Sequence, residues 1–245
     1  HVVPTRDEFA GAGTMDPGIR DRAMDEAESS SSRMLERTVE SLERQGVRAS
    51  ARMASGSEIR TLTQIAGEID ADLVIMGAQP HNALRRALFG SVSDGLRERL
   101  DASLLLARTP PSPERVLIAV DASKAARRGE ELGVELAQAW GSESTVLHVL
   151  STPIYGLDAH RDELAEAYGI PDYAHLRPPV RFELDVGEPH ERILANAEQS
   201  NAGLVVMGSR LPGSQGRFGL GSVSAKVVHQ CEASLLLVRE AQPQA

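Results

Sequence analysis

Apolar and polar positions along the chain form two kinds of pattern, short apolar runs and helical repeats, which follow one another in order. Leu204–Met207 and Leu235–Val238 are continuous apolar runs, as expected of strands that are buried on both faces of a parallel sheet. Between them lie a glycine-rich loop and then a helical pattern that begins at Ser222. The same succession of strand, loop, helix and strand occurs at Leu73–Arg108. It predicts a duplicated α/β unit.

The two copies are displaced by 131 residues at every shared landmark. Aligning residues 56–108 with residues 187–239 gives 18 identities in 53 positions, against about 3–4 expected by chance from ordinary residue usage. The repeat predicts two domains, at residues 1–108 and 115–240, joined by a proline-rich linker at residues 109–114. The first domain has no counterpart of residues 115–143. We therefore expect that strand and helix to come from an upstream segment or from another chain.

The second half carries a full set of alternating elements, which predicts a parallel sheet with helices on both faces. Its predicted strands lie at 116–120, 144–150, 180–185, 204–207 and 235–238, and its predicted helices at 123–140, 162–168, 189–200 and from 222. In the first half, the same patterns predict helices at 19–45, 58–69 and 91–100 and strands at 47–54, 72–76 and 103–107.

Composition narrows the classes of function. Hydrophobic residues make up 41% of the chain and aromatic residues 3%, which predicts aliphatic cores. A net charge of −9 argues against nonspecific nucleic-acid binding, because that binding needs a basic face. Cys231 is the single cysteine, which excludes an internal disulfide and a thiolate metal cluster and favours a reducing cytoplasm. No run approaches the roughly 20 apolar residues of a membrane helix, so we expect no membrane insertion of residues 1–245.

The candidate chemistry lies in the glycine-rich loop before Ser222. Such a loop exposes backbone N–H groups, and a helix start adds partial positive charge, so the stretch suits a phosphate. The alternatives are a plain connection for the loop and a solvated charge for Arg210. The sequence lacks a Walker A lysine and a G-x-S-x-G elbow, and no pair of carboxylates is placed for acid–base work. The histidines lack ligand spacing, which predicts no metal site. Binding is favoured over enzymatic turnover.

Several short motifs stand at the ends of the predicted strands, and as a set they are specific. They are Asp121-Ala122-Ser123 after the first strand of the second half, His148-Val149 at the end of its second strand, Met207-Gly208 at the end of its fourth, and a G-x₂-G-x₉-G-[ST] spacing at Gly208 to Gly221-Ser222 and at Gly77 to Gly90-Ser91. Together they resemble the motifs of the universal stress protein family, in a tandem arrangement.

The resemblance implies an α/β fold with two doubly wound parallel five-stranded sheets of the adenine nucleotide alpha hydrolase-like type. Each sheet would have the strand order 3-2-1-4-5, with a ligand at the carboxyl ends of the strands where the order reverses. The first domain would lack its first strand and helix. The final strands, Ser103–Arg108 and Ser234–Arg239, are expected to pair into an intramolecular pseudo-dimer, and a homodimer is a further expectation.

The resemblance also implies a site in the second half for ATP or AMP. In nucleotide-binding members, the aspartate recognises adenine or its ribose side, the valine backbone meets adenine, and the glycine loop and serines hold phosphates. Carried over, the site residues are Asp121, Val149, Gly208, Arg210, Gly221, Ser222, Val223 and Ser224. Leu211 and Pro80 replace the motif's second glycine in the two copies. The first copy is expected to be degenerate, and nothing in the sequence supports Mg²⁺.

Three hypotheses for function follow. The first is an adenine-nucleotide-binding protein of the cytoplasm that acts in stress response or regulation without an obligatory reaction. The second is a nucleotide-free interaction or regulatory module, such as the soluble end of a larger protein like a transporter. The third is slow ATP hydrolysis, which would require phosphate release dependent on Ser222 or Arg210.

Overall fold

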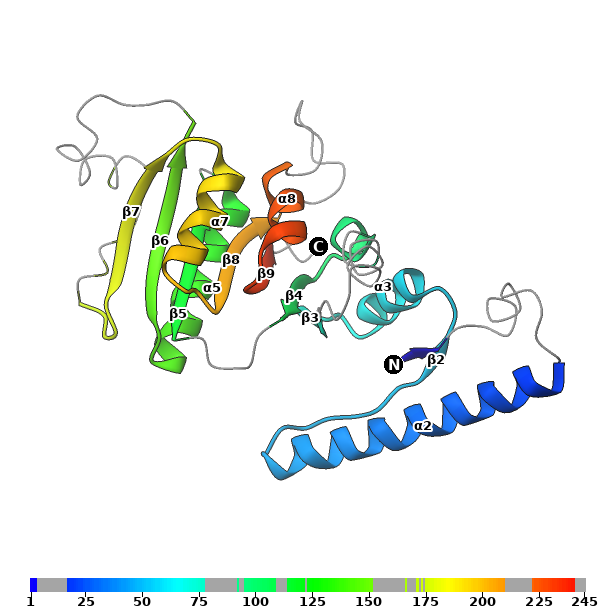
Figure 1. The fold of residues 1–245 in the computed structure, drawn as a ribbon. Coiled ribbons are helices and arrows are strands. Elements are labelled where there is room, and N and C mark those ends of the chain that lie inside the picture. The colour runs from blue at the N-terminus through cyan, green and yellow to red at the C-terminus, as the bar shows by residue number, and fades with distance from the viewer. Residues whose placement is uncertain are drawn as a thin grey trace. The chain divides into compact units, whose positions relative to one another are not determined.

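The computed structural model describes residues 1–3, 17–77, 92, 95–108, 114–121, 123–151, 166, 171, 173, 175–209 and 222–240 (Figure 1). The chain divides into two compact units, His1–Ile69 and Asp70–Ala245. The first unit contains a two-stranded sheet and the second a seven-stranded sheet. Among the helices that the structure describes, none is both long and apolar enough to cross a membrane.

The seven-stranded sheet of Asp70–Ala245 has the order β3-β4-β9-β8-β5-β6-β7. Its elements are β3 (Leu73–Gly77), β4 (Ser103–Ala107), β5 (Arg115–Val120), α5 (Lys124–Trp140), β6 (Glu143–Leu150), β7 (Val180–Val186), α7 (Pro189–Gln199), β8 (Leu204–Ser209), α8 (Ser222–Gln230) and β9 (Ser234–Arg239). The strands of the second half are all parallel and give the order 3-2-1-4-5. Figure 1 shows α7 and α8 on one face of this sheet and α5 on the other. The predicted doubly wound α/β fold is confirmed.

Helix α5 packs closely against the sheet because its buried face includes many small residues, Gly129 and Gly133 among them. The helix begins where the Ser123 hydroxyl accepts a hydrogen bond from the Ala126 N–H at 3.1 Å, and it ends at Gly141, which is left-handed with φ 70°. A Cβ added at Gly133 would lie 2.9 Å from Cγ1 of Ile118 on β5. The close approach seals an aliphatic core of residues from α5 and one face of the sheet, namely Val116, Ile118, Val120, Val134, Ala137, Val146, Leu204, Val206, Leu236 and Val238.

The smaller unit contains β1 (Val2–Val3), α2 (Pro17–Arg44), β2 (Ala54–Ser55) and α3 (Glu58–Glu68). β1 and β2 pair in parallel. The strand predicted at 47–54 is therefore wrong in extent, because β1 offers pairing only to Ala54 and Ser55. The larger apolar residues of that segment stay exposed, with Val47 at 50% and Met53 at 42%.

The first half does not build one continuous sheet. Its strands form two parallel pairs, β1–β2 and β3–β4, which belong to different sheets. In the second half, β5 pairs with both β6 and β8 and so joins the corresponding pairs. The part of the first half that the structure describes contains no counterpart of β5 and α5, as the repeat predicts.

The two halves meet where β4 and β9 pair antiparallel, as predicted for the final strands. Leu105 of β4 lies opposite Leu236 of β9. Two hydrogen bonds flank the ladder symmetrically: the Ser103 hydroxyl accepts the Arg239 backbone N–H at 3.1 Å, and the Ser234 hydroxyl accepts the Arg108 backbone N–H at 3.0 Å. The pairing places β4 in the same compact unit as the second half.

Two arginines at the strand ends, Arg108 and Arg239, each donate hydrogen bonds to the opposite half of the chain. Arg108 donates to the carbonyl of Val228 at 2.6 Å and to that of Cys231, both at the end of α8. Arg239 donates to the carbonyl of Arg97, the residue that corresponds to Val228 in the repeat. Carbonyls in a last helical turn lack intrahelical partners, so each half satisfies the helix end of the other. Burial lowers the pKa of both Arg108 and Arg239.

We expect Arg108→Ala to lower the free energy of unfolding by about 1.5–3 kcal/mol, because charged hydrogen bonds are lost and carbonyls at the end of α8 are left without the guanidinium. Denaturant unfolding of the full chain measures the effect. The matched control is Arg128→Ala on α5, whose half-exposed side chain contacts Glu131 at 3.3 Å and should contribute about 0.5 kcal/mol or less. Equal effects of the two substitutions would show that the hydrogen bonds of Arg108 to the end of α8 do not stabilise the chain.

Candidate functional site

The candidate site lies at the carboxyl ends of β5, β6 and β8, where the strand order reverses. From β5 the chain passes through α5 to β6 on one side, and β8 lies on the other side. The ladder between β5 and β6 ends at Val120 and His148, whereas β6 continues beside β7 to Leu150. The strands therefore separate at this end of the sheet, which is where doubly wound folds bind ligands.

Asp121 is the first residue after β5, and its side chain is exposed. Its Oδ1 accepts a hydrogen bond from the Ser123 backbone N–H at 2.8 Å. The Ser123 hydroxyl in turn caps α5. The Asp-x-Ser motif thus builds the turn between β5 and α5. The same turn holds the Asp121 carboxylate at the open edge of the sheet.

His148 fixes the end of β5 from the neighbouring strand. It is buried on β6 opposite Val120, and its Nδ1 lies 3.1 Å from the Val120 carbonyl oxygen. A carbonyl oxygen can only accept, so Nδ1 carries the proton in this contact. Burial lowers the pKa of His148, while the Val120 carbonyl and Asp121 oppose that shift. The next residue, Val149, is half-buried and lies beyond the last residue of β6 that pairs with β5.

Gly208 is a glycine because the backbone in the first turn of α5 packs directly against it. A Cβ at this position would lie 2.4 Å from the backbone nitrogen of Ala126 and 2.6 Å from the carbonyl carbon of Ala125. No side chain fits there unless the backbone moves. A Cβ at Gly129, one turn further along α5, would lie 3.4 Å from the Gly208 nitrogen. The sequence motif therefore has a packing role at Gly208 that the spacing alone did not reveal.

The part of the site that the sequence predicts for phosphates includes the N-terminus of α8. Ser222 is the first residue of this helix, Val223 is half-buried and Ser224 is buried. Arg210, Gly221 and the Ser222 side chain lie outside the described residues, as do Leu211 and Pro80. Asp121 follows β5, and Val149 and Gly208 are the second-last residues of β6 and β8, so all three lie at the carboxyl ends of parallel strands. α8 ends shortly before the amino end of β9, so its start points toward the same side of the sheet.

Glu130 is a buried polar residue that the sequence patterns did not single out. Its Oε1 accepts a hydrogen bond from the Tyr173 hydroxyl at 2.9 Å. Burial raises the pKa of Glu130, opposed by this hydrogen bond, and burial together with the nearby Glu130 raises the pKa of Tyr173. The signal was available, since residue 130 falls at helical spacing between the buried Ala126 and Val134.

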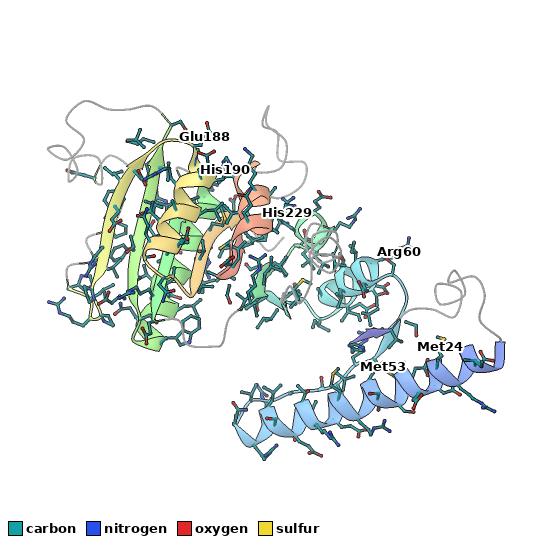
Figure 2. The ribbon with its side chains drawn as sticks, viewed as in Figure 1. Met24, Met53, Arg60, Glu188, His190 and His229 are labelled. Atoms are coloured by element: carbon teal, nitrogen blue, oxygen red, sulfur yellow. The ribbon has the colours of Figure 1, made fainter. Side chains whose placement is uncertain are left out.

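The described histidines do not assemble a metal site. Figure 2 shows His190 near Glu188 at the start of α7 and His229 on α8. His190 Nε2 lies 4.0 Å from an oxygen of Glu191. Within the described parts of the chain, no group of three or more His, Cys, Asp or Glu residues could hold a metal ion.

The motifs and the fold agree with a comparison against known families. The model of the universal stress protein family matches residues 1–108 and, again, residues 113–239. The chain belongs to this family. The two matches show the tandem arrangement that the repeat predicts.

Relatives and solved structures agree with the assignment. The chain is 26% identical over 198 residues to a universal stress protein of Mycobacterium tuberculosis, a match that covers 74% of this chain and 66% of that protein. A universal stress protein of Thermus aquaticus is 34% identical over 134 residues, which cover 51% of this chain and 97% of that protein. The crystal structure of a universal stress protein from Archaeoglobus fulgidus shares the fold, with a TM-score of 0.67, 23% identity and coverage of 94% of this chain and 85% of that one.

Gly208→Ala should destabilise the chain by about 3 kcal/mol, the upper part of the range for overpacking, because the added Cβ meets the α5 backbone rather than a mobile side chain. Thermal or denaturant unfolding measures this loss. Gly77→Ala is the matched control, since Gly77 is the counterpart of Gly208 in the repeat and nothing lies within 4 Å of its added Cβ. A Gly208→Ala protein as stable as the control would show that α5 does not depend on this contact.

His148 should make stability pH-dependent. Because its folded pKa is lowered, the unfolded chain binds the proton more readily, and stability falls as the pH drops below the ordinary value of 6.5. Melting temperatures at pH 7.5 and pH 5.5 should therefore differ more for the wild type than for His148→Gln. Glu130, whose raised pKa acts in the opposite direction, is common to both proteins. Substitution of the exposed His229 by glutamine serves as control, and an equal loss in all three proteins would refute the assignment.

Proposed function

We propose that the second half binds an adenine nucleotide, ATP or AMP, at the carboxyl ends of β5, β6 and β8. The observation that carries the proposal is the placement of the exposed Asp121 carboxylate at a topological switch point, on the same sheet edge as the start of α8. Membership of the universal stress protein family supports it. The site would act in stress response or regulation by binding, in the cytoplasm, without an obligatory reaction.

The proposed roles divide between the two ends of the nucleotide. Asp121 recognises adenine or its ribose side through a carboxylate oxygen, and the backbone of Val149 meets adenine where β6 runs beyond β5. The phosphates lie against the turn after β8 and the start of α8, where backbone N–H groups and the helix dipole favour negative charge. The residues proposed for this part are Gly208, Arg210, Gly221, Ser222, Val223 and Ser224.

We further propose that the chain is an intramolecular pseudo-dimer of two domains, 1–108 and 115–240, with the linker at 109–114. The antiparallel pairing of β4 with β9 supports this arrangement. So do the reciprocal hydrogen bonds of Arg108 and Arg239, whose partners correspond in the repeat. An arrangement in which both halves offer the same groups to each other is what a two-fold interface requires.

A second candidate function is that of an interaction module. It is favoured by the apolar strand β3, whose Ile75 is 62% exposed at the edge of the sheet. The two functions are separable, because β3 belongs to the first half and the proposed nucleotide site to the second.

Mass spectrometry of small molecules released by denaturing the purified chain tests nucleotide binding directly. ATP or AMP in amounts close to one per chain is the expected result. Titration calorimetry with ATP and with AMP then decides between the two. A chain that releases no nucleotide and gives no heat with either compound would leave the interaction module as the better function.

Asp121→Asn should weaken nucleotide binding about 10- to 100-fold, since a hydrogen bond to a charged group is worth about 1.5–3 kcal/mol. The asparagine keeps a side-chain oxygen that can accept the Ser123 N–H, so the turn is retained. Calorimetry gives the affinity, and a thermal melt confirms folding. The control is Asp101→Asn, an exposed aspartate before β4. Unchanged affinity in Asp121→Asn would remove this residue from the site.

A further inference from the structure

A groove lies between the carboxyl-terminal ends of α7 and α8, which Figure 1 shows on the same face of the sheet. Both helices end shortly before the amino ends of β8 and β9, so the groove is at the opposite end of the sheet from the proposed nucleotide site. Its volume is about 440 Å³, within the range of roughly 300–1,000 Å³ that is typical of sites for small molecules. We call it the α7–α8 groove, and the described residues that line it include Leu194, Ala197, Glu198, Gln230, Cys231 and Glu232.

The floor of the groove is apolar. Ala197 and Cys231 are each 7% exposed, and Leu194 is half-buried. Burial raises the pKa of the Cys231 thiol. The thiol is therefore uncharged at neutral pH and contributes apolar surface rather than a nucleophile. A hydrocarbon chain is the kind of ligand group that such a floor accepts.

The rim of the groove is negatively charged. Glu198 lies in the last turn of α7 and Glu232 lies just after α8, and both side chains are exposed. The described residues that line the groove include no lysine, arginine or histidine. Within the part of the chain that the structure describes, neither carboxylate is held by an ion pair. The rim therefore favours a cation.

The two helix ends beside the groove already bind guanidinium groups of this chain. Arg115 Nη1 donates to the Ser200 carbonyl after α7 at 3.1 Å, and Arg108 Nη2 donates to the Val228 carbonyl of α8 at 2.6 Å. The last carbonyls of a helix and its partial negative charge favour such cations. Arg115 also lies 3.9 Å from Glu143, which offsets part of its charge. The groove adds two carboxylates to helix ends of this kind.

The first copy of the repeat carries an arginine where the groove has an uncharged residue. Gln230 and Glu232 correspond to Arg99 and Asp101, so the carboxylate occurs in both copies and the arginine in one. Cys231 likewise takes the place of a leucine. The second copy thus has neither the positive charge nor the larger apolar side chain that the first copy has at these positions.

We propose that the α7–α8 groove binds a small aliphatic cation, an amine or a guanidine on an unbranched hydrocarbon chain. The positive group lies between Glu198 and Glu232, and the hydrocarbon chain lies over Ala197 and Cys231. Charge-assisted hydrogen bonds to the carboxylates and burial of the hydrocarbon both contribute to binding. The inference is independent of nucleotide binding, because the two sites lie at opposite ends of the sheet.

Titration calorimetry of the full chain with agmatine tests the proposal, because agmatine carries a guanidinium and an ammonium at the two ends of a four-carbon chain. Saturable binding is expected at low salt. The affinity should fall when the salt concentration is raised, since the carboxylates of the rim are exposed. Pentanol, which has a similar chain and no charge, should bind at least tenfold more weakly.

Glu198→Gln and Glu232→Gln should each weaken agmatine binding about fivefold, the upper end of what an exposed ion pair contributes. The double variant should lose more than tenfold. Glu135→Gln is the matched control, since it removes the same charge from an exposed glutamate of α5 that does not line the groove. Thermal melts confirm that each variant is folded.

Gln230→Arg supplies the arginine that the first copy carries at this position. Its guanidinium should compete for Glu232, so agmatine binding should fall at least tenfold. Gln199→Arg is the matched control, because it adds the same charge at an exposed glutamine in the last turn of α7 that is not among the described residues of the groove. Loss of binding in Gln230→Arg alone, at an unchanged melting temperature, is a result that a change in net charge would not produce.

Four results would overturn the proposal. The first is the absence of saturable binding of agmatine. The second is equal affinity in the wild type, the double glutamine variant and Gln230→Arg. Pentanol binding as tightly as agmatine would make the groove a site for apolar compounds. A tetra-arginine peptide that binds where agmatine does not would assign the groove to a basic segment of a partner protein.

Discussion

The close approach of α5 to β5 and β8 is the contact on which the second half depends. It requires Gly208 at the end of β8 and Gly133 over Ile118, where an added Cβ would lie 2.4 Å and 2.9 Å from its nearest neighbours. The close approach packs α5 against the aliphatic core, and the hydrogen bonds of Asp121 and Ser123 order the turn between β5 and α5. Asp121 is part of that turn. The packing constraint and the candidate site therefore share the same few residues.

The two copies of the glycine motif show that one spacing can serve different environments. In the second half, a Cβ added at Gly208 would clash with the backbone of α5. At Gly77, the equivalent position of the repeat, an added Cβ would have no neighbour within 4 Å. The motif was interpreted as a phosphate-binding loop, and its first glycine in the second half also has a packing role against α5. Loop glycines and the helix start remain the features that suit a phosphate. A motif residue therefore needs its neighbours to be known before a role is assigned.

The sequence predicted the elements that are covered on both sides and missed what depends on distant partners. β8 and β9 are continuous apolar runs because layers cover both their faces, so their pattern is unambiguous. The alternation at 47–54 predicted a longer strand than forms, because strand length depends on a partner that the pattern does not contain. Arg108 and Arg239 ended predicted strands, but their helix-capping role requires the β4–β9 register. Periodicity cannot supply that register, since it joins residues more than 100 positions apart.

The antiparallel pairing of β4 with β9 also determines how the strands of the two halves are oriented. β3 runs parallel to β4, β8 runs parallel to β9, and β4 opposes β9, so β3 and β8 point in opposite directions. The carboxyl end of β3 therefore lies on the opposite side of the sheet from the carboxyl end of β8, where the nucleotide site is proposed. Arg108 of the first half donates to the Val228 carbonyl at the carboxyl end of α8, whereas the phosphates are proposed to lie at the amino end of this nine-residue helix. The two halves therefore contribute to opposite ends of α8.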